Sequence, residues 1–584
     1  MNPNDRQAAR TNGECDEPQV PLMNVPARNI VPTLEPFYYL KNFERVLATI
    51  LSAYGDLLLP EELRFISEFS QAPLNSRALL ARMVMRRGEL FRASKIHYAE
   101  IGDTQTAAGP LIEAGWLSDR PMLNITQLHD LLTKAELIRC LKLPRRFADW
   151  RKAELKLMLG TQFKESRSFS DWNASADDMV YALLVGPVCE RFRLLFFGND
   201  HQSWTNFVTA DLKLFNYERV ARSARTRPFK SRAQIDAFQG VRECRELLEA
   251  GMPLGELVKI VPAPIEESGW LEEKRQKLLF CIAREHERAG ELGAALSLYL
   301  TCKYRGARTR AIALRARTGD WQGTRALCLE AQENPESEAE LQRVRRVMPR
   351  ANLKLGIPAV PEDPAPVIPK FEIVLERTSR EGAVECHARD HLARGLADGS
   401  TVRYVENGLI NALFGLLFWP AVFAPVPGAF FHDFHRGPAD LASGNFYGRR
   451  KNEFEACFCH LDSNRYRQVI AAVFEQKWGI QSPFIDWQIL DRKLLHWALE
   501  CFPVAHLRAW FEWIIRDVRE NRAGFPDLVQ FWPEEKRYRL IEVKGPGDRL
   551  QDNQRRLLEY CAVHRMPVSV CHVRWSASSL THRA

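Results

Sequence analysis

Two short stretches in the C-terminal part of this 584-residue chain decide its fold: residues 524–532 read GFPDLVQFW and residues 537–544 read RYRLIEVK. Both have the length and apolar content of β-strands, and the short polar linker between them predicts a hairpin. Side chains two residues apart on a strand point to the same face, so Glu542 and Lys544 should project together. Asp527 stands at the start of the preceding strand. The hairpin therefore brings two carboxylates and a lysine to one edge of a small sheet.

These three side chains have an evident chemical use. Two carboxylates can hold a hard divalent cation such as Mg²⁺, and a lysine beside them can orient or activate a water molecule. The spacing from Asp527 to Glu542 and Lys544 is common by chance, so the flanking residues carry the argument. A Gly-Pro-Gly turn follows at 545–550, and residues 568–573 supply another strand. This combination matches the signature of the PD-(D/E)XK nucleases, and that resemblance implies metal-dependent cleavage of a phosphodiester bond.

The wider sequence around the hairpin resembles a known family. Residues 521–529 (NRAGFPDLV) and 542–550 (EVKGPGDRL) are similar to the VRR-NUC type of PD-(D/E)XK nuclease. An upstream segment, 406–419, leads from Glu-Asn-Gly into an apolar run and continues the likeness. On these motifs, residues 371–584 resemble a Fanconi-associated nuclease, and the chain is identified as a bacterial member of that family.

The resemblance implies a set of site residues. The ligands of one or two Mg²⁺ or Mn²⁺ ions would be three carboxylates, one of them on an upstream helix, and one main-chain group: Asp527, Glu542, Glu406 and Val543. Lys544 would be the catalytic lysine. Gln554 would support the site from the helix that begins near Asp552.

The resemblance also implies an activity. Members of the family are structure-specific DNA nucleases that cleave 5′ flaps, degrade DNA from 5′ ends and act in interstrand-crosslink repair, so branched or flapped duplex DNA is the expected partner. Some members hold a terminal 5′ phosphate with a basic residue just before the helix glutamine, and Asn553 stands there in this chain. The sequence therefore supports flap cleavage more directly than 5′→3′ exonuclease stepping.

Two other functions stay open at this point. A Holliday-junction resolvase can use the same catalytic motif, although an N-terminal extension of some 370 residues is unexpected for such an enzyme. A non-catalytic DNA-repair scaffold would use only the helical regions, and it predicts a disrupted Asp/Glu/Lys set. All three members of that set are present in this chain.

Residues 126–160 predict two amphipathic helices joined by a Leu-Pro turn at 143–144. The first helix should run from Thr126 to the proline, and the second contains Lys152 followed by Ala-Glu-Leu. The pair resembles the SAP module, a small DNA-binding helical hairpin, which makes Lys152 an expected DNA contact. Lys142 stands where a glycine is usual before the Leu-Pro pair. Two ordinary amphipathic helices are the alternative interpretation.

Positive charge is concentrated at residues 211–232, where seven basic residues accompany only two acidic ones. Basic side chains that contact phosphates add sequence-independent affinity for DNA, and the interleaved aromatic residues could stack on bases. A solvated charged helix face is the alternative. The expected DNA contacts are Arg219, Arg222, Arg225, Arg227, Lys230 and Arg232 in this cluster, with Arg539 and Arg549 beside the catalytic hairpin.

A repeat follows the basic cluster. Residues 290–300 align with residues 319–329, and each block is preceded by a helical pattern. The arrangement resembles paired TPR-type helices, although the repeat is shorter than is usual for them. Such repeats form docking surfaces, so we expect possible protein partners here and no catalytic residues.

A proline-rich segment at 357–370 marks the clearest boundary, because dense prolines favour an extended linker. We expect a multi-domain, mainly α protein whose helical, SAP-like and TPR-like regions precede an α/β nuclease domain. The expected divisions are a disordered tail (1–35), an N-terminal helical domain (36–125), a SAP-containing DNA-binding domain (126–265), TPR-like repeats (266–356), the linker (357–370) and the VRR-NUC domain (371–584).

Composition sets outer limits on the function. Hydrophobic residues are 46% and charged residues 26% of the chain, which is globular composition, and the net charge of +8 is small for this length. Thirteen cysteines are too dilute for a disulfide scaffold, and the N-terminus lacks a secretory signal. The one long apolar run, 409–431, is broken by prolines, so no membrane partner is expected. We expect a cytoplasmic protein, associated with the nucleoid in a bacterium or nuclear in a eukaryote.

Overall fold

The computed structural model describes most of the chain and divides it into two compact units. The described residues are 36–86, 88–172, 178–199, 202, 204, 215–221, 223, 225–265, 268–358, 366–376, 383–394 and 399–576. Among these residues, one unit is formed by those within 36–204 and 229–239, and the other by those within 215–228 and 240–576. The predicted tail at 1–35, Arg222 and linker residues 359–365 lie outside the described residues. The predicted fold class, mainly α with a C-terminal α/β domain, is confirmed.

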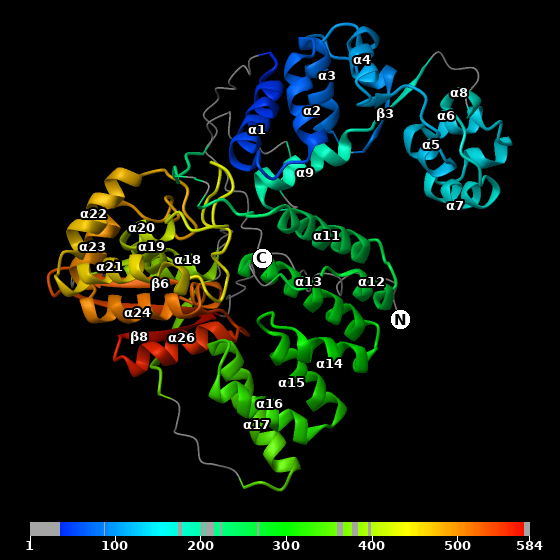
Figure 1. Cartoon of the computed structure of the whole chain (residues 1–584). Coiled ribbons are helices and arrows are strands. Elements are labelled where there is room, and N and C mark those ends of the chain that lie inside the picture. Colours follow the sequence, from blue (N-terminus) through cyan, green and yellow to red (C-terminus); the bar gives the residue numbers. More distant parts are fainter. Residues whose placement is uncertain are drawn as a thin grey trace, which may run out of the picture. The chain divides into compact units, whose positions relative to one another are not determined.

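The N-terminal part of the first unit combines helices with a small sheet (Figure 1). Its elements are α1 (Tyr38–Tyr54), α2 (Pro60–Gln71), α3 (Leu74–Val84), β1 (Leu90–Arg92), α4 (Thr104–Glu113), β2 (Leu117–Ser118), β3 (Val180–Leu183) and α9 (Gly186–Phe197). β3 is the central strand of this sheet and pairs antiparallel with both β1 and β2. β3 and α9 follow the SAP-like region in the sequence, and they therefore complete the N-terminal domain that precedes that region.

The SAP-like region has one more helix break than the sequence pattern predicts. Its elements are α5 (Ile125–Leu131), α6 (Lys134–Cys140), a 3₁₀ turn (Arg145–Ala148), α7 (Lys152–Gln162) and α8 (Phe169–Trp172). The prediction of a single helix from Thr126 to the proline is wrong, because Thr133 caps a new helix. The carboxylate of Glu136 accepts the Thr133 N–H at 2.7 Å, and the Thr133 hydroxyl accepts the Glu136 N–H in return. Lys142 has a φ of 49°, which explains why a glycine is usual at this position.

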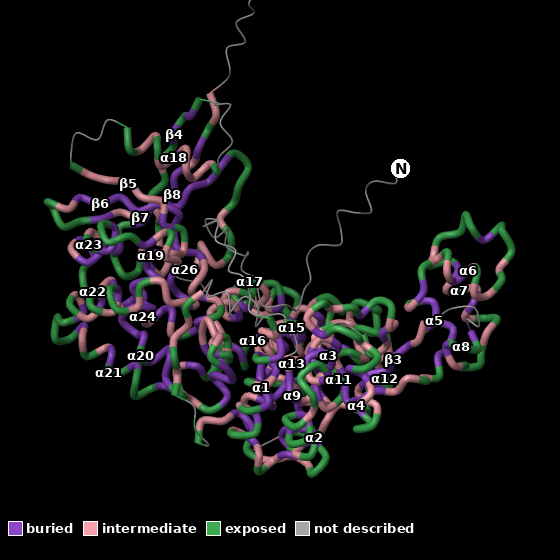
Figure 2. The backbone as a smooth tube through the Cα atoms, turned by 90° about the horizontal axis from the view of Figure 1, so that it is seen from above, coloured by how far each residue is buried: buried purple, intermediate pink, exposed green. Residues whose placement is uncertain are grey.

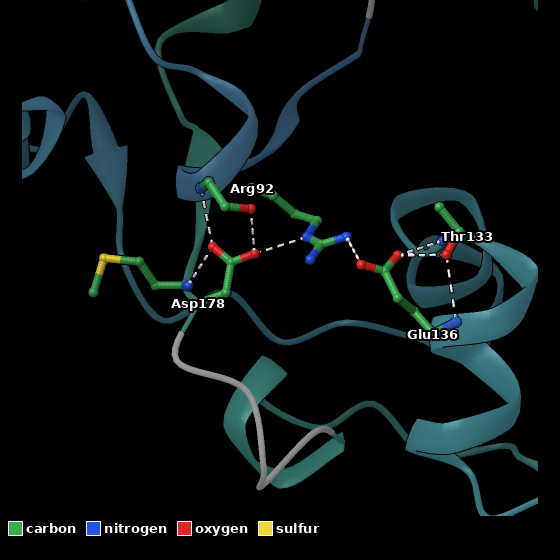
Figure 3. A network of polar contacts seen from close by, with 6 residues as sticks. Arg92, Thr133, Glu136 and Asp178 are labelled. Atoms are coloured by element: carbon green, nitrogen blue, oxygen red, sulfur yellow. Dashed lines mark hydrogen bonds and ion pairs between the residues drawn. The ribbon is translucent and has the colours of Figure 1, made fainter.

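One arginine attaches the SAP-like helices to the N-terminal sheet (Figure 3). Arg92, at the end of β1, donates through Nη1 to Glu136 Oε1 and through Nε to Asp178 Oδ2, both at 2.8 Å. Asp178 also accepts the backbone N–H groups of Ser94 and Met179, each at 3.0 Å. The side chains of Arg92 and Asp178 are only 10% and 8% exposed, so water screens this pair little. The network ties β1, the entry to β3 and α6 together.

A series of helices forms the first part of the second unit. They are α11 (Arg232–Glu249), which contributes residues to both units, α12 (Leu254–Ile260), α13 (Gly269–Arg288), α14 (Leu292–Thr301), α15 (Ala307–Thr318), α16 (Trp321–Glu333) and α17 (Glu338–Lys354). Each helix from α13 to α16 packs against the next one. The predicted helical pairs are present, and their assignment to the TPR class stays a prediction.

The repeat identified in the sequence is also a repeat of contacts. His286 Nδ1 lies 2.5 Å from Glu291 Oε2, and Arg315 Nη1, at the equivalent position of the next pair, lies 2.8 Å from Asp320 Oδ2. In both pairs a glycine in the left-handed region, with φ of 82° or 83°, ends the first helix. A glycine cap and a side-chain contact at equivalent positions therefore recur at both helix-to-helix turns.

A five-stranded mixed sheet forms the centre of the C-terminal domain. Its strands are β4 (Lys370–Leu375), β5 (Thr401–Tyr404), β6 (Leu528–Trp532), β7 (Arg537–Lys544) and β8 (Val568–Trp575), in the order β4-β8-β7-β6-β5. β6 is antiparallel to β5 and β7, and β8 is parallel to β7 and β4. The predicted hairpin is β6–β7. α26 (Asp552–Val563) connects β7 to β8, as a parallel connection requires.

Helices cover both faces of this sheet. The cross-strand pair Val529 and Leu540 belongs to one large core. The adjacent pair, Leu528 and Ile541, belongs to a second core under α18 (Val384–Ala393). The large core also contains helices α19 (Gly408–Leu417), α20 (Trp419–Val422), α21 (Lys451–Asp462), α22 (Tyr466–Lys477), α23 (Arg492–Cys501), α24 (Val504–Arg516), α25 (Val518–Asn521) and α26. Figure 2 shows β6 and β8 largely in the colour of buried residues. Within the described ranges, no helix is long and apolar enough to cross a membrane.

Candidate active site

The β6–β7 hairpin brings the predicted catalytic residues together. Leu528 pairs with Ile541 across the two antiparallel strands, and continuing this register places Asp527 opposite Glu542. Lys544 follows two residues later, on the same face as Glu542. Asp527 and Lys544 are each 8% exposed, and Glu542 is fully buried. Three ionisable groups therefore share one partly enclosed edge of the sheet.

The carboxylate of Glu542 has few hydrogen-bond donors or positive charges near it inside the protein. Lys544 Nζ lies 2.9 Å from Glu542 Oε1 as an ion pair, and no described group reaches either oxygen with good hydrogen-bond geometry. Burial raises the pKa of Glu542 to about 7, and the nearby charge of Asp527 adds to the rise while Lys544 opposes it. A buried carboxylate in this condition suits a cation as its partner.

Asp527 is held by the main chain of the two neighbouring strands. Its Oδ2 accepts the Val543 N–H at 2.8 Å, and its carbonyl accepts the N–H groups of Val405 and Glu406 at 2.8 and 3.1 Å. Burial raises the pKa of Asp527 to about 6, against the opposing effect of the Val543 N–H. The carboxylate is thus fixed in direction, while its other oxygen, Oδ1, accepts no hydrogen bond from the described residues.

Glu406 lies beside this pair but not within a helix. It occupies the turn between β5 and α19, and the expectation of a helical glutamate is wrong by two residues, because Asn407 in the left-handed region precedes the first turn. The Glu406 backbone is fixed by Asp527, whereas its carboxylate accepts a hydrogen bond from the Tyr404 hydroxyl. In the part of the chain described, no three acidic, histidine or cysteine side chains surround one point closely enough to hold a metal ion.

A fourth acidic residue belongs to the same electrostatic environment and was missed by the sequence analysis. Glu385 lies in the first turn of α18, which packs against β4, β5 and β7. Among neighbouring charges, Glu385 comes before Glu406 in raising the pKa of Asp527. Nothing in the local sequence points to Glu385, because its proximity to Asp527 comes from the packing of a distant helix. Four carboxylates near one lysine leave this edge with excess negative charge.

The segment before Asp527 is fitted tightly to α26. Gly524 has a φ of 95°, and a Cβ at this position would lie 2.9 Å from the carbonyl carbon of Asn553 and 3.0 Å from the Gln554 nitrogen. Gln554 itself caps α26, since its Oε1 accepts the Gln551 N–H at 2.9 Å. Gln554 is predicted to support the site, and in the structure its side chain makes this helix cap. The glycine of the motif therefore permits a close approach that fixes α26 beside the active site.

The basic residues expected near the hairpin take different positions. Arg539 lies on the opposite face of the sheet from Glu542, where Nη2 donates to Gln530 Oε1 at 2.8 Å. Burial lowers the pKa of Arg539. Arg549 is exposed in the turn after β7. Of the two, Arg549 is the exposed one, and its contact with DNA stays a prediction.

The basic cluster at 211–232 is divided between the two units. Residues 215–228 belong to the nuclease unit, where Glu218 forms an ion pair with Lys477 at 2.8 Å and accepts the Trp419 Nε1–H at 3.1 Å. Arg219 is exposed beside this anchor, and Arg225 is also exposed while Arg227 is half-buried. Arg232 belongs to the other unit.

Arg232, Lys230 and Lys152 belong to the N-terminal unit. Arg232 is paired with the fully buried Glu62 at 2.8 Å and with Asp236 at 2.9 Å, which makes it a structural residue. Lys230 is exposed. Lys152 begins α7, and its carbonyl lies 2.9 Å from His129 Nε2. DNA contacts by the predicted basic residues stay predictions.

Comparison with known proteins decides the family. The family model of the VRR-NUC domain matches residues 461–575, the FAN1 HTH-domain model matches 37–118, and the model of the Fanconi anemia-associated nuclease SAP domain matches 122–172. The Fanconi-associated nuclease 1 homolog of Pseudomonas aeruginosa is 47% identical over 541 residues, which cover 93% of this chain and 96% of that protein. The chain belongs to the Fanconi-associated nuclease 1 family.

More distant relatives and solved structures agree. The homolog of Arabidopsis thaliana is 22% identical over 92% of this chain and 67% of its own length. A crystal structure of paFAN1 bound to DNA with a two-nucleotide 5′ flap and a gap has 47% identity and a TM-score of 0.86, and covers 94% of this chain and all of that one. A second structure, with a one-nucleotide flap, gives a TM-score of 0.85 with 47% identity over 93% of this chain. This member of the Fanconi-associated nuclease 1 family is therefore a structure-specific DNA nuclease, and the family's PD-(D/E)XK chemistry implies use of a divalent metal.

Proposed function

We propose that this nuclease cleaves 5′-flapped duplex DNA by Mg²⁺- or Mn²⁺-dependent hydrolysis at the β6–β7 hairpin. The observation that carries the proposal is the buried Glu542 carboxylate, which has one lysine and no described hydrogen-bond donor to balance it. The flap preference is supported by the two paFAN1 structures with 5′-flap DNA. With 47% identity over nearly the whole chain, the same substrate class is the simplest expectation for this protein.

The donor set at this edge fits one or two divalent cations. Asp527 and Glu542 supply carboxylate oxygens, the Val543 main chain adjoins both, and Glu406 can join them when its side chain leaves the Tyr404 hydroxyl. Oxygen ligands of this kind are those preferred by Mg²⁺ and Mn²⁺. A bound cation would stabilise charge on the phosphoryl oxygens and help to ionise water.

The protein's own residues orient the reaction. Lys544 is held beside Glu542, so its ammonium group can donate to an attacking water or to a phosphoryl oxygen. Asp527 keeps a fixed direction through the Val543 N–H. Asp527 and Glu542 oppose each other across the hairpin, so the cleaved phosphate would lie at this edge, within reach of the exposed Arg549.

The remaining predicted contacts would hold the duplex. The SAP-like helices with Lys152 and the exposed Arg219 and Arg225 would contact backbone phosphates, which add affinity without sequence preference. Arg232 is less suited to this role, because Glu62 and Asp236 neutralise it. In the cell, the expected roles are repair of interstrand crosslinks and action where the DNA lies, on the nucleoid if the source is bacterial.

The test compares substrates and site variants in one experiment. The full chain and its Asp527→Ala variant are incubated with 5′-flap, Holliday-junction and single-stranded DNA, with Mg²⁺, Mn²⁺ or EDTA. We expect metal-dependent cleavage of the 5′ flap by the parent, none by the variant, and unchanged DNA binding by both. Symmetric cutting of the four-way junction in preference to the flap would favour the resolvase. Cleavage in EDTA would remove the metal from the proposal.

A further inference from the structure

Two asparagines fasten the turn that carries Glu406 to the segment that precedes β6. Asn407 directly follows Glu406, and its Oδ1 accepts the Phe525 N–H at 2.9 Å. Asn411, one turn later in α19, donates through Nδ2 to the carbonyls of Asn407 and Arg522, at 2.5 and 2.7 Å. None of these atoms belongs to the catalytic hairpin or to a charged group. We call Asn407 and Asn411 the asparagine clamp.

The side chain of Asn407, and not only its backbone shape, holds the turn. Its φ of 50° lies in the left-handed region, which glycine adopts at lower cost than asparagine. A glycine would keep this turn but would provide no acceptor for the Phe525 N–H. Phe525 is 3% exposed, so its N–H would be left without an acceptor in a buried environment. An acceptor at position 407 is therefore what the asparagine adds.

Asn411 supplies two donors in a single orientation of its amide. It is 6% exposed, and exchange of its amide nitrogen and oxygen would set Oδ1 against two carbonyl oxygens. In the orientation observed, Oδ1 is buried and has no donor among the described residues, which costs free energy. An apolar side chain of similar size would avoid that cost, so the two donor contacts are the reason for an amide here. The asparagine clamp therefore needs a donor at position 411 and an acceptor at position 407.

These contacts join two of the expected metal ligands through their backbones. The carbonyl of Asp527 accepts the N–H groups of Val405 and Glu406 at 2.8 and 3.1 Å. The contact between Asn407 and Phe525 lies one residue after Glu406 and two residues before Asp527. It closes a short ring of hydrogen bonds that includes the backbones of both ligands. Loss of the asparagine clamp would let the Glu406 turn move relative to Asp527, although both carboxylates would remain.

We propose that Asn407 and Asn411 are positioning residues for the divalent cation, because they fix the Glu406 turn relative to Asp527. Neither asparagine is assigned a contact with the cation. Groups that orient metal ligands typically contribute about 10–100-fold to metal affinity. The inference rests on the proposed metal-dependent hydrolysis, and it extends the site beyond its carboxylates and lysine.

The test measures the Kd of the full chain for Mn²⁺ in the absence of DNA by isothermal titration calorimetry. Asn407→Gly keeps the left-handed turn and removes the acceptor, so its Kd should be about 10-fold higher than that of the parent. Asn407→Asp keeps the acceptor, so its Kd should not exceed the parental one. The matched control is Asn464→Gly, because Asn464 is exposed, has a φ of 55° in the turn between α21 and α22, and makes no side-chain hydrogen bond with the described residues. This control should bind Mn²⁺ as the parent does.

Aspartate should have the opposite effect at the second position. Asn411→Asp adds the same negative charge but loses both donors, so its Kd for Mn²⁺ should rise about 10-fold. If both aspartate variants changed the Kd in the same direction, added charge would explain the result and the positioning role would be overturned. Urea unfolding in EDTA checks that each variant is folded under the binding conditions. If Asn411→Asp does not fold, Asn407→Gly, Asn407→Asp and Asn464→Gly still decide the question.

Asp527→Ala distinguishes a failure of this inference from a failure of the proposed function. This variant lacks a ligand, so its Kd for Mn²⁺ should rise by at least about 10-fold. If it does, and Asn407→Gly binds Mn²⁺ as tightly as the parent, the asparagine clamp does not position the ligands, while the metal site stands. If Asp527→Ala binds Mn²⁺ with the parental Kd, the cation lies elsewhere, and both the proposed metal site and this inference are wrong.

Discussion

At the residue scale, the site is dominated by the burial of like charges. Asp527 and Glu542 face each other with the pKa of each raised, chiefly by burial, and the rise is opposed by Lys544 at both carboxylates and by the Val543 N–H at Asp527. Without a bound cation, ionisation of either carboxyl opposes folding. The buried carboxylates that serve the function therefore lower the stability of the metal-free protein, so removal of one of their charges should raise that stability.

Asp527→Asn should stabilise the metal-free protein above neutral pH. The pKa of Asp527 in the folded protein is about 6, above its ordinary 3.8, so the stability it contributes is complete below the ordinary value and is lost as pH rises through 6. We expect urea unfolding in EDTA at pH 8 to show a gain on the order of 3 kcal/mol, and a smaller gain at pH 5. The asparagine still accepts the Val543 N–H. Exposed Glu534→Gln should change neither value, and an equal gain at both pH values would contradict the assignment.

Glu385→Gln should weaken metal use without abolishing cleavage. The charge of Glu385 acts on Asp527 from the first turn of α18, so its loss reduces the attraction of the site for a divalent cation. We expect the Mn²⁺ concentration for half-maximal cleavage to rise about 10-fold, with a similar rate at saturating metal. Asp390→Asn, on the same helix and paired with Arg389, is the matched control. An unchanged Mn²⁺ requirement in Glu385→Gln would show that this carboxylate is only a bystander.

At the element scale, the geometry of the site depends on how β6, β7 and α26 approach one another. The strands and their hairpin could be predicted because alternation, a short polar turn and a Gly-Pro pair all indicate the same structure. The break between α5 and α6 was missed, although Thr133 and Glu136 form a capping box that the sequence displays. Glu385 could not be found in this way, because the packing of α18 on the sheet is a long-range property.

Gly524→Ala should damage the site through backbone geometry alone. The new Cβ would meet the backbone of Asn553 and Gln554 at 2.9–3.0 Å, and the φ of 95° is unfavourable for alanine. We expect a loss of about 1–3 kcal/mol in urea unfolding, together with slower cleavage. Gly547→Ala has a similar φ of 88° but nothing within 4 Å of its Cβ, so it should lose only the stability that corresponds to the backbone strain. Equal losses for the two variants would mean that the close approach to α26 is unimportant.

At the scale of the whole molecule, the sequence predicts the order of the domains but not which distant segments complete each domain. The family models match residues 37–118 and 122–172, and the predicted limits of the domains stay predictions. β3 and α9, however, lie after the SAP-like helices and complete the N-terminal domain. Residues 215–228 join the nuclease unit through Glu218, an acidic residue within a basic cluster. Both features depend on tertiary pairing that local patterns do not encode.

Arg92→Gln should loosen the SAP-like helices from the N-terminal sheet. The variant removes an ion pair to Asp178 and another to Glu136, and leaves two carboxylates without their shared cation. We expect faster amide hydrogen exchange in α6 and at the start of β3, measured by mass spectrometry, with exchange in β6–β8 unchanged. Arg139→Gln, an exposed arginine on α6, is the matched control. Unchanged exchange in α6 would show that the other contacts of the region suffice.

The most direct test of the account is a single-turnover measurement of Mn²⁺-dependent cleavage of 5′-flap DNA by Lys544→Met. The buried lysine beside Glu542 is expected to act on the water or the phosphate, so its loss should slow cleavage by about 10²–10⁴-fold while flap binding is retained. Lys536→Met, in the exposed turn of the same hairpin, should cleave at the parental rate. Cleavage by Lys544→Met at a rate near that of the parent would contradict the assignment of the β6–β7 hairpin as the catalytic centre.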